Sequence, residues 1–199
     1  MENIRVFNQE ILSDKKYPLK EISFEKPGKN GQAIRQLHEI YYRPDAVAVL
    51  MIDYQEQKIL LTRQFRMPTY LNGNESGYLI EACAGLIDDM ESPEEAVVRE
   101  ALEETGYKVF NLKKVGGVYP SAGGLTEFLH LFIAEYQSSG LHEDGGGLEE
   151  EGEHIENLEI GFNQALFKVK NGGFSDAKTL LLLQHFFLTK ADLNTGNLK

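Results

Sequence analysis

The chain has 199 residues, of which 42% are hydrophobic and 10% aromatic, a composition ordinary for a folded globular protein. Its 31 acidic residues outnumber its 20 basic ones, and the net charge of -11 argues against a broad basic surface for nucleic acid. With one cysteine and five scattered histidines, neither a disulfide framework nor a Cys/His zinc site is supported.

The sequence shows no signal for export or membrane insertion. The longest apolar runs, residues 46–52 and 180–188, fall well short of the roughly 20 residues that span a bilayer. The N-terminal segment lacks a basic region followed by an apolar one. We therefore expect a cytoplasmic protein with no membrane partner.

The N-terminal part reads as a small β-rich unit. Residues 4–12, 18–26 and 32–42 are typical of strands, and the "PGKNG" turn at 27–31 separates the last two. Such a unit is too small to fold alone. We predict an N-terminal β subdomain over residues 1–43 and a main domain over 44–199.

The remainder mixes strands with helices. Residues 46–52 and 58–65 predict a hairpin, and a loop rich in Gly and Asn leads to an extended segment at 78–85. Further extended segments are expected at 113–119, 127–136 and 154–160, and helices at 163–170 and 176–188. The pattern predicts an α+β fold.

The middle of the chain has a strong helix signal. Ser92 can cap the helix, Pro93 suits its first position, and Glu95 completes a capping box. Gly106 is expected to end the helix.

The two sides of this helix differ in character. At about 100° per residue, the apolar side, expected to face the core, carries Val98, Ala101, Leu102 and Thr105. The other side, expected to be exposed, carries Glu100, Glu103 and Glu104. Clustered carboxylates are hard-oxygen ligands that suit Mg²⁺ or Mn²⁺, although a solvated acidic helix face would show the same pattern.

The spacing of the residues in 85–107 favours a metal site over a solvated acidic helix face. The stretch fits the Nudix box, G-x5-E-x7-R-E-U-x-E-E-x-G-U, where U is a bulky apolar residue. The seven fixed identities fall at Gly85, Glu91, Arg99, Glu100, Glu103, Glu104 and Gly106. Ala101 and Tyr107 fill the U positions, and Ala101 is small for its place.

The chain thus resembles the Nudix hydrolases, which cleave a nucleoside diphosphate linked to another group. The resemblance implies a Nudix fold, an α/β/α sandwich with a mixed sheet, and a need for Mg²⁺, for which Mn²⁺ can substitute. It also implies metal ligands at Glu100 and Glu104, with Glu103 near them or bound to the metal through water, and a backbone oxygen from Ala84. Glu91 and Arg99 would form an ion pair that holds the loop on the helix.

Several other segments, such as "LTRQFR", "LIEACAGL" and "DAKTLLLL", are similar to the GDP-mannose pyrophosphatase branch, a neighbour of the ADP-sugar pyrophosphatases. In that branch the N-terminal β unit is exchanged between two subunits, so the resemblance implies a homodimer. Residues of both subunits would then build each site.

The resemblance also implies residues that bind the substrate. Arg66 would hold a phosphate, for which its forked donors are suited. The other implied contacts are Lys16, Glu39, Gly85, Glu127 and Lys178. Ordinary surface positions remain the alternative for Arg66, Glu127, Lys178, Lys16 and Glu39.

The acidic, glycine-rich loop after residue 145 offers candidates for the general base, among them Glu149 and Glu150. The resemblance favours Glu151 or Glu153, one as a further metal ligand and the other as the base. Counting from Gly147 selects Glu151, whereas counting back from Ile155 selects Glu153. We expect Glu153 as the metal ligand more than Glu151, with both kept as catalytic candidates.

The predicted function is a Mg²⁺-dependent nucleotide-sugar pyrophosphatase, with water attacking phosphorus of GDP-mannose to give GMP and mannose 1-phosphate. One departure concerns Leu37 and His38, because the branch has two basic residues just before Glu39. ADP-ribose or an ADP-sugar therefore stays an alternative substrate. A non-catalytic nucleotide-binding module and a glycosyl hydrolase acting at the sugar carbon are further alternatives, disfavoured by the complete box.

Overall fold

The structure is a computed structural model that describes residues 4–148, 152 and 154–195. The elements, in chain order, are β1 (Arg5–Asp14), β2 (Pro18–Pro27), β3 (Ala33–Tyr41), β4 (Ala46–Asp53), β5 (Lys58–Phe65), α1 (Met67–Leu71), β6 (Tyr78–Glu81), β7 (Cys83–Leu86), α2 (Pro93–Thr105), β8 (Phe110–Val118), β9 (Leu129–Glu135), β10 (Glu156–Gly161), α3 (Phe162–Lys170) and α4 (Ala177–Thr195). They form two compact units, one made of Met1–Asp45 with Tyr119–Leu129, and the other made of Ala46–Val118 with His130–Lys199.

The first unit is a three-stranded antiparallel sheet in the order β1-β2-β3. This confirms the three strands predicted at the N-terminus. Of the residues in these strands, Ile22 is the buried one, at 6% exposure, so the sheet has almost no core of its own. The loop 119–129 joins this unit through the backbone N–H of Tyr41, which donates to the carbonyl of Gly124 at 2.8 Å.

The second unit is built around a seven-stranded sheet in the order β10-β5-β4-β9-β8, with β6 paired to β5 and β7 paired to β4. Strands β4 and β5 run antiparallel, as the predicted hairpin requires. Strands β4 and β9 meet at their C-terminal ends, where Tyr136 N–H donates to the Ile52 carbonyl at 3.0 Å, so this pair runs parallel. The sheet is therefore mixed, as expected.

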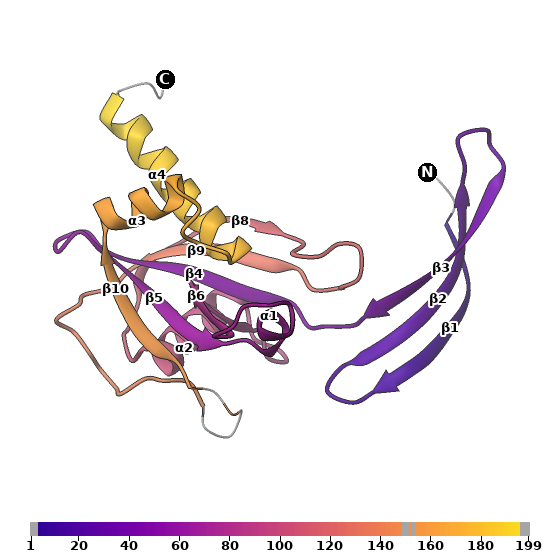
Figure 1. Ribbon diagram of the computed structural model, residues 1–199, viewed down its shortest axis with the longest axis horizontal. Coiled ribbons are helices and arrows are strands. Elements are labelled where there is room, and N and C mark those ends of the chain that lie inside the picture. The colour runs from indigo at the N-terminus through magenta and orange to yellow at the C-terminus, as the bar shows by residue number, and fades with distance from the viewer. Residues whose placement is uncertain (1–3, 149–151, 153, 196–199) are drawn as a thin grey trace. The chain divides into compact units, whose positions relative to one another are not determined.

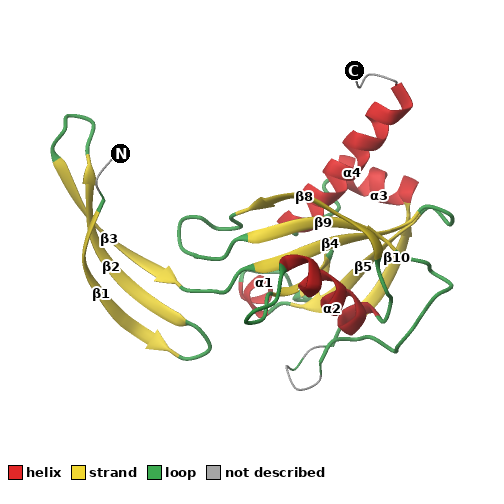
Figure 2. Ribbon diagram, turned by 180° about the vertical axis from the view of Figure 1, so that it is seen from behind, coloured by secondary structure: helices red, strands yellow, loops and turns green. Residues whose placement is uncertain are grey.

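Helices cover both faces of this sheet. Helix α2 packs against β7 and β4 on one face, and α3 and α4 lie on the other (Figure 1 and Figure 2). Every residue of β4 is buried, because its alternating side chains meet a helix layer on either side. Val47, Val49 and Met51 share one core cluster with Ala96 and Val97 of α2. The α/β/α arrangement is confirmed.

Some local expectations were wrong. Val98 is 46% exposed and its neighbour Val97 is buried, so the buried face of α2 lies about one residue away from the predicted one. That face includes Glu104, a charged residue that hydropathy alone assigns to the surface. The short helix α1 was not expected, and α4 extends beyond residue 188 to Thr195. Within the described residues, no helix combines the length and apolar character needed to cross a bilayer.

Candidate active site

Helix α2 begins where the sequence predicts and its start is firmly capped. The Ser92 hydroxyl accepts a hydrogen bond from Glu95 N–H at 3.3 Å, and the Glu95 carboxylate accepts one from Ser92 N–H at 2.9 Å. These bonds form a complete capping box, with Pro93 in the first turn. The cap fixes the register of the acidic residues that follow.

The C-terminal end of α2 anchors the acidic loop. Gly106 takes a left-handed conformation, with φ 75°. The N–H groups of Gly146 and Gly147 donate to the carbonyls of Glu104 and Glu103, at 2.8 and 3.2 Å. Such bonds satisfy helix-end carbonyls that have no partner within the helix.

Both described ends of the loop meet at this place. Ile155 N–H donates to the Gly146 carbonyl at 3.0 Å, and the Asn157 side chain donates to the Thr105 carbonyl at 2.8 Å. Residues 149–151 and 153, and with them the candidates Glu149, Glu150, Glu151 and Glu153, lie outside the described residues.

Arg99 ties the preceding loop to the helix. Its Nε and Nη2 donate to the two oxygens of Glu91 at 2.9 and 2.8 Å, and Nη2 also donates to the Leu86 carbonyl at 2.9 Å. This is the bidentate geometry for which a guanidinium is suited. The hydrogen bond from Arg99 lowers the pKa of Glu91 despite some desolvation.

The same arginine also engages the helix carboxylates. Its Nη1 donates to Glu100 at 2.9 Å and to Glu103 at 3.0 Å. The acidic helix face therefore has a cation of its own, which offsets part of the repulsion between neighbouring carboxylates.

Gly85 leaves room for the Glu100 carboxylate. A Cβ built on Gly85 would lie 1.9 Å from the Glu100 side-chain carboxyl carbon and from one of its oxygens. Any other residue at position 85 would displace this carboxylate. The glycine of the box is thus explained by close approach between β7 and α2.

Glu104 is more deeply buried than the other two carboxylates on this face of α2, Glu100 and Glu103. It is 4% exposed, which corrects the expectation that it lies on the surface. Its Oε2 accepts a hydrogen bond from Ala84 N–H at 3.2 Å, and a buried carboxylate is tolerated only with such partners. Burial and the neighbouring Glu104 raise the pKa of the Cys83 thiol well above its usual range.

The donors in this region fit a hard divalent cation. Glu100 and Glu104 are one helical turn apart and both lie against β7, through Gly85 and Ala84. Burial raises the pKa of the nearby Cys83 thiol, which disfavours a thiolate ligand, and the donors that Glu100 and Glu104 offer are oxygen atoms. Among the residues that the structure describes, no three Asp, Glu, His or Cys side chains converge on one point. The helix pair is therefore the part of the site that these residues supply.

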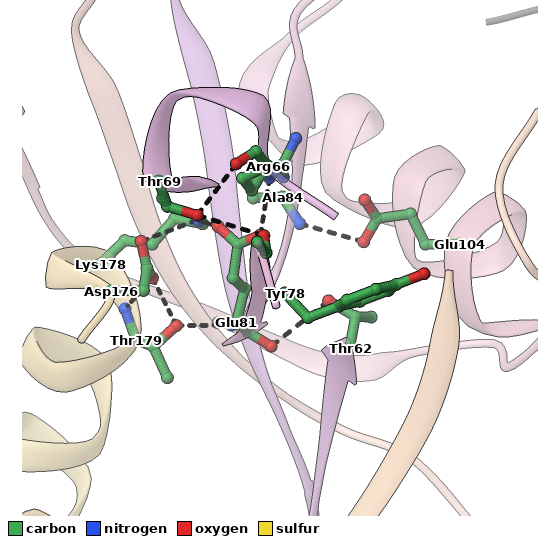
Figure 3. A network of polar contacts seen from close by, with 12 residues as sticks. Thr62, Arg66, Thr69, Tyr78, Glu81, Ala84, Glu104, Asp176, Lys178 and Thr179 are labelled. Atoms are coloured by element: carbon green, nitrogen blue, oxygen red, sulfur yellow. Dashed lines mark hydrogen bonds and ion pairs between the residues drawn. The ribbon is translucent and has the colours of Figure 1, made fainter. Parts of the chain in front are cut away.

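A second charged cluster lies at the end of β6, around its last residue, Glu81. Glu81, 4% exposed, pairs with Arg66 through Nε at 2.7 Å and with Lys178 through Nζ at 2.5 Å (Figure 3). Lys178 also pairs with Asp176 at 3.1 Å. The structure thus brings together two of the predicted substrate-binding residues, Arg66 and Lys178, around one buried carboxylate.

A surface pocket of about 750 Å³ adjoins this cluster. Its lining includes Thr69, Asn74, Ile80 and Phe174, and no residue of the box 85–107. The Thr69 hydroxyl donates to the Arg66 carbonyl at 2.9 Å. The lining includes none of Arg66, Glu81, Asp176 and Lys178, so the pocket is distinct from their ion pairs as well as from the carboxylates of α2.

The remaining predicted substrate contacts, Lys16, Glu39 and Glu127, belong to the first unit. Glu127 pairs with Arg43 at 2.7 Å, and its side chain is 13% exposed. Lys16 and Glu39 are exposed, and Glu39 faces Glu21 across the β2–β3 pair.

Sequence reasoning missed Glu81, Asp176 and Arg43 as members of these clusters. Glu81 carried a usable signal, since it is an acidic residue inside the apolar stretch "YLIEACAG". A charge in a buried strand needs partners, and the partners here are cations. Asp176 and Arg43 stand in polar segments, where sequence shows no such contrast.

Comparison with known proteins agrees with this geometry. The NUDIX domain model matches residues 42–183. The chain is 47% identical to a GDP-mannose pyrophosphatase of Pectobacterium atrosepticum, covering 92% of this chain and 93% of that protein. It is 46% identical to a GDP-mannose pyrophosphatase of Cronobacter sakazakii, covering 94% and 96%.

The fold is also similar to that of a protein with much lower sequence identity. A solved structure of an ADP compounds hydrolase superposes with a TM-score of 0.70 at 19% identity, covering 98% of this chain and 97% of that one. Taken with the box geometry on α2 and β7, the family match and these relatives show that the chain belongs to the Nudix family.

Proposed function

We propose that the chain is a Mg²⁺-dependent nucleotide-sugar pyrophosphatase that hydrolyses GDP-mannose to GMP and mannose 1-phosphate. The observation that carries the chemistry is the pair Glu100 and Glu104 held against β7 by Gly85 and Ala84. The substrate rests on the relatives named GDP-mannose pyrophosphatase, which align with the chain over more than nine tenths of its length.

Glu100 and Glu104 would hold the cation with the carbonyl of Ala84, and Glu103 would stay beside them on Arg99. When bound, a divalent cation supplies positive charge that offsets the charge developing on the diphosphate oxygens. Mn²⁺ offers similar oxygen coordination and can take its place. Arg99 and Glu91 keep the loop folded on the helix, so the carboxylates stay in register.

The general base would be Glu151 or Glu153, and the other would be a further ligand of the cation. The proposal is supported by the described ends of their loop: the N–H groups of Gly146 and Gly147 donate to the carbonyls of Glu104 and Glu103, and Ile155 N–H donates to the carbonyl of Gly146. A base from this loop would abstract a proton from the attacking water.

Arg66 and Lys178 would bind phosphate oxygens, and Gly85 would add a substrate contact through its backbone. Glu127, which is ion-paired with Arg43, would accept hydrogen bonds from sugar or base. Lys16 and Glu39 would reach the nucleotide of a second subunit.

The chain would act as a homodimer. The support is the poor core of the first unit, whose sheet leaves apolar side chains open to solvent: Ile4, Val6, Ile11, Leu12, Ile34 and Leu37 are 43–65% exposed. A second copy would cover them. Light scattering would then give a mass of twice the 22.5 kDa of one chain, and the mass of one chain would contradict the dimer.

Shared sites can be tested by mixing two inactive variants, Glu104→Gln and Glu39→Gln. If each site needs Glu104 of one subunit and Glu39 of the other, mixed dimers contain one intact site. Activity should then return to about a quarter of the wild-type level after subunit exchange. No recovery between two variants that do form mixed dimers would contradict shared sites.

The substrate is tested by comparing kcat/KM for GDP-mannose, ADP-ribose and ADP-glucose with Mg²⁺. We expect GDP-mannose to be preferred, with GMP as the nucleotide product. Leu37, which is 56% exposed, and His38, whose ring packs on Phe24, occupy the positions where the branch has basic residues. This favours ADP-ribose or an ADP-sugar as the second candidate, for which AMP would be the product. Turnover of none of the three would favour a non-catalytic binding module.

A further inference from the structure

Each of the two carboxylate oxygens of Glu81 pairs with a different cationic side chain. Oε2 accepts from Arg66 Nε and Oε1 accepts from Lys178 Nζ, while the Glu81 side chain is 5% exposed. Removing a carboxylate from water costs several kcal/mol, which close cations and good geometry offset. The pair of contacts brings a strand-end arginine and a helix-start lysine to one point.

The surroundings make this arrangement rigid. The Asp176 carboxylate accepts from Thr179 N–H at 2.9 Å and also pairs with Lys178. The Thr179 hydroxyl in turn accepts from Ala82 N–H at 2.6 Å, so the end of β6 is bonded to the first turn of α4 (Figure 3). Lys178 is therefore held by two carboxylates. The backbone next to Glu81 is held by the hydrogen bond from Ala82 to Thr179.

The cluster retains donors that can face a ligand. Glu81 occupies one of the five N–H donors of the Arg66 guanidinium, whose side chain is 38% exposed. Lys178 has three donors, and its pairs with Glu81 and Asp176 use two of them. The cluster therefore combines fixed cations with remaining donor capacity.

The cluster is also close to the metal-binding carboxylates. Ala84, which donates to Glu104, follows Glu81 by three residues, a span of at most about 11 Å of extended chain. Figure 3 draws the pairing of Glu81 with Arg66 and the hydrogen bond between Ala84 and Glu104 in one close view. One diphosphate-containing ligand can be served by both groups of side chains.

We propose that Glu81 is a positioning residue, which holds Arg66 and Lys178 together as a clamp for a phosphate group of the substrate without touching the substrate itself. The identity of that substrate as a nucleoside diphosphate sugar rests on the function proposed above. The formal charges of Glu81, Asp176, Arg66 and Lys178 cancel, so the clamp acts through the direction of its donors. Donors oriented in advance bind an anion without the cost of rearrangement.

The direction in which the affinity for an anion changes in Glu81→Gln distinguishes a positioning role of Glu81 from a purely electrostatic one. Glu81→Gln removes a negative charge, which by charge alone should strengthen the binding of an anion. If Glu81 positions the clamp, the same change should weaken binding, because both cations lose their shared partner. Glu81→Asp keeps the charge but is one methylene shorter, so it should weaken binding as well.

The probe is inorganic pyrophosphate without added metal, with its Kd measured by titration calorimetry. We expect the Kd to rise about tenfold in Glu81→Gln and Glu81→Asp, as for the loss of a charge-assisted contact. With Mg²⁺ and GDP-mannose, KM should rise by a similar factor while kcat changes by less than about threefold. The matched control is Glu159→Gln, because Glu159 also pairs with a lysine, Lys58 at 2.8 Å, but lies on β10.

An unchanged or lower Kd in both Glu81 variants would overturn the proposal, and so would an equal rise in the Glu159→Gln control. If Glu81→Gln does not fold, the Kd of the charge-preserving variant Glu81→Asp for pyrophosphate is the deciding measurement. Pyrophosphate binding requires no turnover. A Glu81-dependent Kd in a protein that leaves nucleotide sugars intact would therefore support the clamp and refute the proposed function.

Discussion

The carboxylate of Glu104 accepts a hydrogen bond from the backbone N–H of Ala84 at 3.2 Å, so the end of α2 is fixed to strand β7. The next residue, Gly85, admits the carboxylate of Glu100. Two neighbouring backbone positions thus receive the two carboxylates that stand one helical turn apart. The proposed cation site would depend on this match between strand and helix.

Glu104→Gln is expected to lower kcat by at least about a hundredfold, because an amide is a poor ligand for a hard cation. The amide keeps a carbonyl oxygen that can still accept from Ala84, so the circular dichroism spectrum should be unchanged. Glu94→Gln, an exposed position in the first turn of the same helix, is the control and should keep full activity. Near-wild-type turnover in Glu104→Gln would remove Glu104 from the site.

Gly85→Ala tests the close approach of β7 to α2. The added methyl group would meet the flexible end of Glu100, so the carboxylate should move while the fold survives. We expect kcat to fall at least about tenfold and the half-saturating Mg²⁺ concentration to rise. Gly116→Ala in β8, where a Cβ meets nothing within 4 Å, should leave both unchanged. Equal Mg²⁺ dependence in the two variants would contradict the proposed contact.

Glu91→Gln should reduce stability in a pH-dependent way. The Arg99 hydrogen bond holds the pKa of Glu91 below the value of 4.5 expected without such a partner. The stabilisation is therefore fully present above about pH 5 and is lost as the pH falls through the lowered pKa. Urea unfolding of both proteins at pH 7 and near pH 3 should show a difference that shrinks in acid. A difference independent of pH would exclude the ion pair as its source.

Asp53→Asn should destabilise the protein without affecting the site. Burial alone would raise the pKa of Asp53, but hydrogen bonds from Ser138, Glu56 and Gln55 lower it to about 2. The carboxylate accepts from both the N–H and the hydroxyl of Ser138, at 2.9 and 2.7 Å. We expect a loss of about 1–3 kcal/mol at pH 7, typical of hydrogen bonds to a charged group.

The pH dependence of that loss has a defined window. The stabilisation by Asp53 is present above about pH 4 and disappears as the pH falls through the folded pKa of about 2. Thermal unfolding at several pH values would show it, while kcat/KM stays at the wild-type value. A large loss of activity in a folded Asp53→Asn protein would show that the β4–β5 turn supports the site.

The sequence predicted most of the architecture, because each strand and helix has a local signal. The cap of α2 follows from Ser92 and Glu95, and the end of the helix from Gly106. The face that α2 buries was misjudged, since periodicity weighs hydrophobicity alone. Glu104 is buried because Ala84 N–H offers it a partner, and that contact joins residues 20 positions apart.

The cluster around Glu81 also depends on contacts between residues that are far apart in the sequence. Arg66 and Lys178 could be singled out only by resemblance, because isolated basic residues look like any surface residue in a sequence. Their common partner, Glu81, is separated from Lys178 by 97 positions. Contacts over such distances arise from the packing of α4 beside β6, which no local pattern specifies.

Hydrolysis in ¹⁸O-labelled water, followed by mass spectrometry of the products, tests the central claim most directly. Attack on phosphorus predicts that, with Mg²⁺ and GDP-mannose, the label enters the phosphate of GMP or of mannose 1-phosphate. The labelled product would also identify which phosphorus atom the water attacks. Label in the sugar hydroxyl, with unlabelled GDP released, would show attack at the sugar carbon and contradict the role given to the carboxylates of α2.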